Sequence, residues 1–336
     1  MDFRKVQVTG GNSFVVSLPK SWVKEVGLRP KDAVAVITQP DDSLLIVPRR
    51  DLRQVSKPEA AIDVVSGMDR DGVLRHYISH YLTGYDVVRV NLGKADAAFR
   101  GAIRDGIRRK LVGVEIIEES PTALLTQCLS GYADLPLKKA VERMGIIASG
   151  MVSDSVAALR SDESGFAKEV IDRDDEVDRF YHFILRQLNI AIRDRSVIQE
   201  MGLGSARDCL GYRLVAKSVE RVGDHAVQIA SQAEALNSLP ESSLKRIKDL
   251  AELSRKVFEG SVTALLRLDP KFAEEAIGKA GEVSRIEEKL SGEMLAARMN
   301  GAQVGSVRLV LESIRRIAEY GADISETALD LMVREP

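Results

Sequence analysis

The chain has 336 residues, of which 45% are hydrophobic and 29% are charged, so it can bury the cores of two or three soluble globular domains. Its net charge of −2 excludes a globally basic protein, and any nucleic-acid-binding surface must therefore be local. The longest stretches without Asp, Glu, Lys or Arg are residues 6–19 and 120–133. Both fall short of the roughly 20 residues that span a bilayer, so we do not expect a membrane-embedded protein.

The N-terminal residues and the cysteines predict the cellular compartment of the protein. The N-terminal MDFRKVQVTG has neither the apolar core nor the cleavage site of a secretion signal. Cys128 and Cys209 stand alone, without the spacing of a disulfide framework or of a Cys-based zinc site. We therefore expect a cytoplasmic protein.

Residues 1–52 form the first predicted domain, a small unit in the order β, β, α, β, β. Residues 4–8 and 14–18 read as strands around a glycine turn, Pro19 opens a short helix, and residues 34–38 and 44–47 read as a hairpin. Residues 1–50 contain 8 Lys and Arg against 5 Asp and Glu. A unit this small buries little apolar surface, so we expect it to form a homodimer.

The pattern G-x-S-x-x-V-x-L-P-K-x-W-V at residues 11–23 resembles the SpoVT/AbrB family of swapped-hairpin DNA-binding domains. The resemblance implies a small β-barrel built from the interleaved strands of two chains, with DNA as a partner. The residues that would neutralise DNA phosphates are Arg4, Lys5, Lys20, Lys24 and Arg29. Two alternatives remain: the five are ordinary solvated charges, or the domain serves only for dimerisation or toxin neutralisation.

Residues 57–135 read as a small α/β domain whose role the sequence does not predict. Helices are expected at residues 73–82 and 96–111, and strands at 86–92, 112–117 and 123–129. Arg100, Arg104 and Arg108 share one face of the second helix. This basic stripe either binds an anion or is the solvated side of an amphipathic helix.

Residues 137–239 and 244–333 form two helical repeats, called the first repeat and the second repeat below. FAKEVIDRDDEVDRF at 166–180 aligns with FAEEAIGKAGEVSRI at 272–286, and RLVAKSVERVGD at 213–224 aligns with RLVLESIRRIAE at 308–319. The alignments predict three helices in each repeat, with an insertion between the second and third helices of the first.

Two acidic pairs distinguish the first repeat. Asp174 takes a core-facing position that is Ala280 in the second repeat, and Asp178 follows four residues later. Glu220 and Asp224 form the same i, i+4 pair on the third helix. These four carboxylates can converge on a metal cofactor, and the sequence leaves iron, zinc, manganese and magnesium open. The alternative is a salt-bridged bundle whose cationic partners would be Arg179, Arg213 and Arg221.

The two three-helix repeats and the E(D)-x-x-x-D pairs resemble the PhoU family, whose members bind multinuclear metal clusters through such motifs. The second repeat departs from the motif at three of its four positions, because Ala280, Ser284 and Arg315 replace the acids. An AbrB-like head, an α/β middle segment and a PhoU-like tail together resemble archaeal phosphate-uptake regulators.

The resemblances imply a DNA-binding transcriptional regulator, acting negatively on phosphate uptake and phosphate homeostasis, with a phosphate transporter or signalling protein as a further partner. The alternative is an adaptor that does not bind DNA and docks on such a partner, with the head serving only for dimerisation. We do not expect an enzyme. Carboxylate-bridged di-iron enzymes carry Glu-x-x-His, and no Glu stands three residues before any His here.

Overall fold

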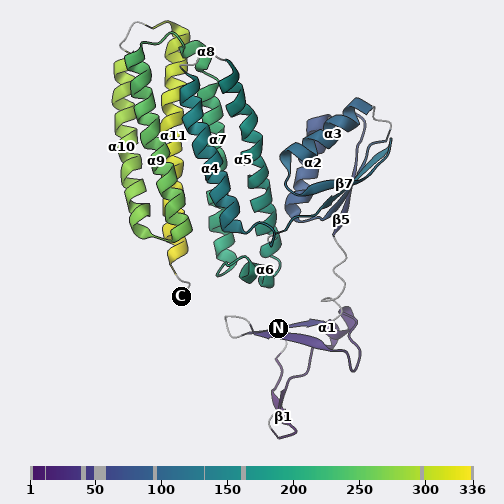
Figure 1. The fold of residues 1–336 in the computed structure, drawn as a ribbon. Coiled ribbons are helices and arrows are strands. Elements are labelled where there is room, and N and C mark those ends of the chain that lie inside the picture. The colour runs from purple at the N-terminus through teal and green to yellow at the C-terminus, as the bar shows by residue number, and fades with distance from the viewer. Residues whose placement is uncertain are drawn as a thin grey trace. The chain divides into compact units, whose positions relative to one another are not determined.

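The computed structural model describes residues 3–11, 13–38, 43–48, 58–93, 97–131, 133–159, 164–295 and 299–333. The chain divides into two compact units, residues 1–58 and 59–336 (Figure 1). No helix in the described ranges is long and apolar enough to cross a membrane.

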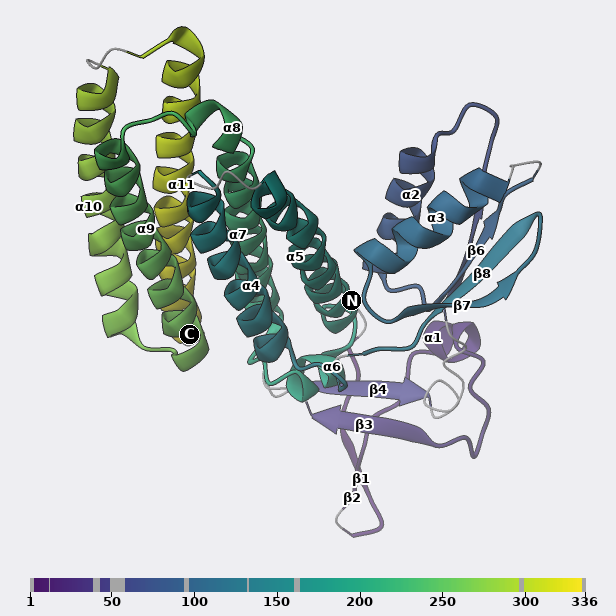
Figure 2. The ribbon, with the colours of Figure 1, turned by 45° about the horizontal axis from the view of Figure 1, so that its top comes forward.

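The N-terminal unit contains two separate antiparallel hairpins. Strand β1 (Gln7–Thr9) pairs with β2 (Ser13–Val15), helix α1 spans Lys20–Glu25, and β3 (Val34–Thr38) pairs with β4 (Leu44–Pro48) (Figure 2). Gly10 and Gly11 form the first turn with φ angles of 58° and 92°, which a residue with a Cβ rarely adopts. The predicted order β, β, α, β, β is confirmed. Within the described residues the single chain forms open hairpins and no closed barrel.

The predicted α/β domain contains a four-stranded sheet and two helices. Its elements are β5 (Glu59–Asp63), α2 (Arg70–Thr83), β6 (Val87–Asn91), α3 (Ala97–Lys110), β7 (Val114–Glu119) and β8 (Ala123–Cys128). The strand order is β5-β6-β8-β7, with β5 parallel to β6 and the other pairs antiparallel. Figure 2 shows α2 and α3 on one face of this sheet. The sequence analysis missed β5, whose short EAAID segment carries an acidic residue at each end.

Six long helices and two short ones are described in the part of the chain that follows the α/β domain. The first repeat contains α4 (Leu137–Ala158), α5 (Ser164–Ala191) and α7 (Ala206–Ala230), and the second contains α9 (Glu241–Arg267), α10 (Pro270–Leu295) and α11 (Gly301–Met332). The predicted insertion contains the short helix α6 (Arg195–Glu200), and α8 (Ala233–Leu236) lies between the repeats. One continuous apolar core runs through both repeats.

A buried arginine joins the α/β domain to the first repeat. Arg186 of α5 is only 2% exposed. One of its terminal nitrogens donates to the carbonyl oxygens of Tyr81 and Tyr85 at 2.6 and 2.8 Å, and the other to Asp86 Oδ1 at 2.6 Å. Asn189 donates to the Leu82 carbonyl oxygen at 2.9 Å. These bonds satisfy carbonyl groups at the C-terminal end of α2. Helix α5 therefore packs in the bundle and also binds the α/β domain.

Candidate functional site

The predicted metal residue Asp174 lies on the core-facing side of α5, between the fully buried Val170 and Val177. Its Oδ1 atom is buried and has no hydrogen-bond partner. Gly223 of α7 provides the room for it, because a Cβ at Gly223 would lie 3.1 Å from Asp174 Oδ1. The carboxylate therefore sits where α5 and α7 approach each other over a glycine.

The four predicted carboxylates influence one another. Burial, followed by the negative charges of Asp178, Asp224 and Glu220, raises the pKa of Asp174 to about 7. Burial also raises the pKa of Glu220, although its hydrogen bond from Lys217 acts in the opposite direction. The structure thus brings both acidic pairs into one region of the first repeat, as the spacing predicts.

Three of the four carboxylates already have cationic partners. Lys217 Nζ contacts both oxygens of Glu220 at 2.5 and 2.6 Å. Arg221 pairs with Asp224 at 3.1 Å, and Lys110 of α3 lies 3.5 Å from Asp178 Oδ2. Among the residues that the structure describes, Asp174 alone of the four has no such partner. Among the residues described, no three His, Cys, Asp or Glu side chains are arranged to hold a metal ion.

Of the three arginines considered as partners, the structure pairs only Arg221 with these acids. Arg179 and Arg213 form no salt bridge with them within the described part of the chain. Sequence reasoning missed Lys217 and Lys110. Lys217 precedes Glu220 by three residues, a helical spacing that could have revealed it. Lys110 belongs to another domain, so no local pattern indicated it.

In the second repeat, a salt bridge and small side chains stand at the corresponding positions. Ala280 is buried at 5% exposure, and the Ser284 hydroxyl donates to its carbonyl oxygen at 3.3 Å. Arg315 pairs with Glu319 one turn further along α11. The second repeat therefore lacks the unbalanced negative charge of the first: small side chains stand on α10, and Arg315 balances Glu319 on α11.

The five basic residues predicted to bind DNA are all exposed in the N-terminal unit. Lys20 and Lys24 lie one turn apart on α1, and the backbone N–H of Arg29 donates to Asp32 Oδ2 at 2.8 Å. Every residue of β1 and β2 is exposed. The structure therefore leaves these positive charges accessible, beside strands that bury no side chain.

The basic stripe of α3 is partly neutralised by acids. Arg100 lies 3.3 Å from Glu119 of β7, and Arg104 lies 3.0 Å from Asp105 and 3.8 Å from Glu119. Arg108 is exposed. These contacts favour the solvated face of an amphipathic helix over an anion site.

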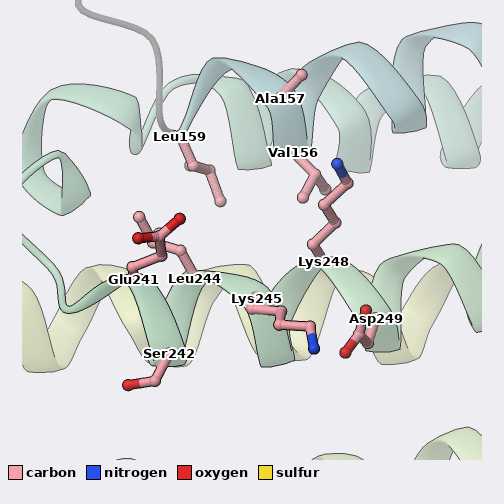
Figure 3. Close-up of a pocket in the computed structure, with 9 residues that line it drawn as sticks. All are labelled: Val156, Ala157, Leu159, Glu241, Ser242, Leu244, Lys245, Lys248 and Asp249. Atoms are coloured by element: carbon pink, nitrogen blue, oxygen red, sulfur yellow. The ribbon is translucent and has the colours of Figure 1, made fainter.

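A cavity of about 560 Å3 lies between the end of α4 and the start of α9 (Figure 3). Its charged lining consists of Lys245, Lys248, Glu241 and Asp249, so positive and negative side chains balance. Val156 and Leu159 form part of its apolar wall. This balance gives the cavity no preference for an anion or a cation.

The helical repeats match a known family over more than half of the chain. The model of the PhoU domain covers residues 141–233 and 247–328. The chain belongs to the PhoU family. The two matched segments fall within the two three-helix repeats, so each repeat contains one PhoU segment.

Curated relatives support this membership. A phosphate-specific transport system accessory protein PhoU homolog of Rhizobium meliloti is 25% identical over 197 residues, which cover 57% of this chain and 81% of the relative. A Caulobacter vibrioides protein of the same description is 35% identical over 95 residues, or 28% of this chain and 38% of the relative. The crystal structure of PhoU from Pseudomonas aeruginosa has a TM-score of 0.52 at 22% identity, covering 58% of this chain and 94% of that one, and agrees in fold.

A second family model matches the N-terminal unit. It is described as antidote-toxin recognition MazE, bacterial antitoxin, and it covers residues 7–54. The chain therefore joins an AbrB/MazE-like head to PhoU repeats, as the sequence patterns indicate.

Proposed function

We propose that this PhoU-family protein is a DNA-binding transcriptional regulator of phosphate uptake and phosphate homeostasis, with negative action. The regulatory half of the proposal is supported by PhoU relatives described as accessory proteins of phosphate-specific transport. Such a protein is not an enzyme. A phosphate transporter or signalling protein is its proposed second partner.

The single observation that supports DNA binding is a basic head whose described residues contribute no side chain to a buried apolar core. Val8 is 61% exposed and Phe14 is 77% exposed, although both lie in strands. Isolated two-stranded hairpins are marginal in water, so a second copy is the natural cover for these apolar side chains. A homodimer would place two sets of Arg4, Lys5, Lys20, Lys24 and Arg29 on one DNA duplex.

The test is a titration of the full-length chain against DNA from upstream of its own gene and of neighbouring transporter genes, at two salt concentrations. We expect tight binding that weakens steeply with salt, because each neutralised phosphate releases counterions. The Arg4→Ala, Lys5→Ala variant should bind more weakly and with a shallower salt slope. Binding no tighter than to random-sequence DNA would contradict the proposal.

The second candidate is an adaptor that docks on a transport or signalling partner without binding DNA. It is favoured by the match of the head to an antitoxin family, since an antitoxin binds a protein. Under this hypothesis, replacing Arg4 and Lys5 leaves regulation in cells intact, whereas the DNA-binding regulator loses it. Light scattering coupled to size exclusion measures the dimer that both hypotheses require.

We also propose that Asp174, Asp178, Glu220 and Asp224 bind a metal cation in the first repeat. The support is the unpartnered, buried Oδ1 of Asp174 and the mutual repulsion of the four carboxylates. Carboxylate oxygens suit hard cations, and a bound cation would supply the positive charge that Asp174 lacks. Because no three acidic side chains of the described residues are arranged to hold an ion, the side chains would have to move together on binding, and Glu220 and Asp224 would exchange their contacts with Lys217 and Arg221 for the metal.

A further inference from the structure

A cavity of about 480 Å3 lies beside the segment that joins the α/β domain to the first repeat. Arg143 of α4 and Glu176, Arg179 and Phe180 of α5 line one part of it. Val112 and Leu135 line the remainder. The volume falls within the range of small-molecule sites, and the lining combines apolar walls with a few charged groups, as such sites do.

Both arginines of this cavity lack a carboxylate partner among the described residues. Neither Arg143 nor Arg179 forms a salt bridge with any residue that the structure describes. The Nε atom of Arg179 is buried and has no hydrogen-bond acceptor. The guanidinium of Arg143 lies 5.7 Å from the centroid of the Phe180 ring. A buried donor without an acceptor costs about 1–3 kcal/mol, so Arg179 creates a demand for an acceptor, and the exposed Arg143 adds a second positive charge to the same cavity.

The second repeat indicates that packing alone does not require this pair. Arg179 aligns with Arg285, which is exposed and whose Nε donates to the Gly281 carbonyl oxygen of its own helix at 3.3 Å. Arg143 aligns with Asp249. The same helical framework thus forms in the second repeat without two arginines at these positions.

We propose that this cavity binds a small phosphate-bearing anion through Arg143 and Arg179. The planar guanidinium group matches two oxygens of a phosphate at once, which a lysine ammonium cannot do. Val112, Leu135 and Phe180 exclude water from part of the cavity and so strengthen the attraction.

Glu176 gives the cavity a means of selecting phosphate over sulfate. Inorganic phosphate keeps at least one O–H group at neutral pH, and a carboxylate can accept a hydrogen bond from it. Sulfate has no such proton and would meet the Glu176 carboxylate as a like charge. A phosphate monoester keeps a second ionisation near pH 6, so it would bind less well than inorganic phosphate unless a hydroxyl group of the ester takes the place of that proton.

The position of the cavity suits a sensor. Helix α5 carries Arg179 in the cavity and, two turns later, Arg186 in the joint with the α/β domain. An anion bound between α4 and α5 would therefore act on the helix that seats this domain. This role as the phosphate input rests on the proposed regulatory function, whereas the binding chemistry of the cavity does not.

Isothermal titration calorimetry of the full-length chain tests the site, with inorganic phosphate, sulfate and glycerol 3-phosphate in separate titrations. We expect saturable binding of phosphate or of the monoester, and weaker binding of sulfate. Arg143→Gln and Arg179→Gln should each weaken binding by about 10- to 100-fold, the effect of losing a hydrogen bond to a charged group. Arg285→Gln, at the aligned position of the second repeat, is the matched control and should bind like the wild type. Glu176→Gln should bring the affinities for phosphate and sulfate closer together.

Circular dichroism of each variant shows whether it is folded, and the exposed Arg143 provides a readable variant if Arg179→Gln unfolds. The proposal is wrong if the folded wild type binds neither phosphate nor the monoester, or if both arginine variants bind them unchanged. The DNA titration is read separately in phosphate-free buffer. If the chain binds phosphate but no specific DNA, the DNA-binding regulator is refuted and the anion site stands. If it binds specific DNA but no anion, the anion site alone is refuted.

Discussion

The two PhoU repeats share one helical framework and differ in what they place between the second and third helices. In the first repeat, Asp174 lies over Gly223. The aligned residues of the second repeat are Ala280 and Ala318, both buried. The space between the second and third helices is filled by a carboxylate facing a glycine in the first repeat and by two alanine methyl groups in the second. The comparison teaches that the first repeat retains a costly buried acid that its packing does not require.

A second difference concerns the outer side of the second helix. Arg186 of the first repeat holds the α/β domain, whereas the aligned residue of the second repeat is the exposed Gly292. Within the described residues, the α/β domain contacts α5 and makes no comparable contact with α10. Helix α5 of the first repeat therefore contributes residues to the acidic cluster, to the cavity lined by Arg143 and Arg179, and to the joint with the α/β domain.

The largest effect is expected from removing acidic residues from the first repeat. Asp174→Ala with Glu220→Ala should abolish metal binding, because it removes one carboxylate from each helix of the proposed site. The measurement is metal content per chain by mass spectrometry after purification without chelator. Arg315→Ala with Glu319→Ala, at the positions of the second repeat that align with Glu220 and Asp224, is the control and should leave the metal content unchanged. Metal retained by the first variant would refute the site, and a folded, metal-free wild type would favour the salt-bridged bundle.

The next largest effect is expected from breaking the joint with the α/β domain, which among the described residues is formed by the first repeat alone. Arg186→Met removes three hydrogen bonds and leaves Asp86 without its partner, which should cost roughly 3 kcal/mol in the stability of the α/β domain. Amide hydrogen exchange of α2 and β6 should accelerate accordingly. Arg285→Met, on the second helix of the other repeat, provides the control. Equal exchange in both variants would show that the joint does not stabilise the domain.

The smallest effect is expected from substitutions that make the first repeat resemble the second. Asp174→Ala with Gly223→Ala recreates the Ala280 and Ala318 arrangement and removes a buried oxygen without a partner, so the metal-free chain should gain about 1–3 kcal/mol in its free energy of unfolding. Urea unfolding in the presence of chelator measures this change. Ala280→Asp, the reverse change in the second repeat, should destabilise the chain. A loss of stability in the double variant would mean that the Asp174 carboxylate is compensated in the folded chain.

Much of this arrangement was predictable because it depends on local periodicity. The β, β, α, β, β order of the head follows from alternation and from the turn at Gly10 and Gly11, and the repeated helices follow from two gap-free alignments. The convergence of the acidic pairs follows from i, i+4 spacing on two adjacent helices. The missed strand β5 is too short to show alternation. Its backbone is held in the strand conformation by pairing with β6, which its own sequence does not indicate.

The sequence by itself determined the domain order, the repeat and the loss of acids from its second copy. Only the tertiary structure decided which charges meet. Lys110 reaches Asp178, and Arg186 holds the end of α2. Arg179, an available partner in the salt-bridged alternative, pairs with none of the acids among the described residues. The physical reason is that spacing along a helix fixes neighbours one turn apart, whereas partners 60 or more residues away are chosen by the docking of the α/β domain on α5.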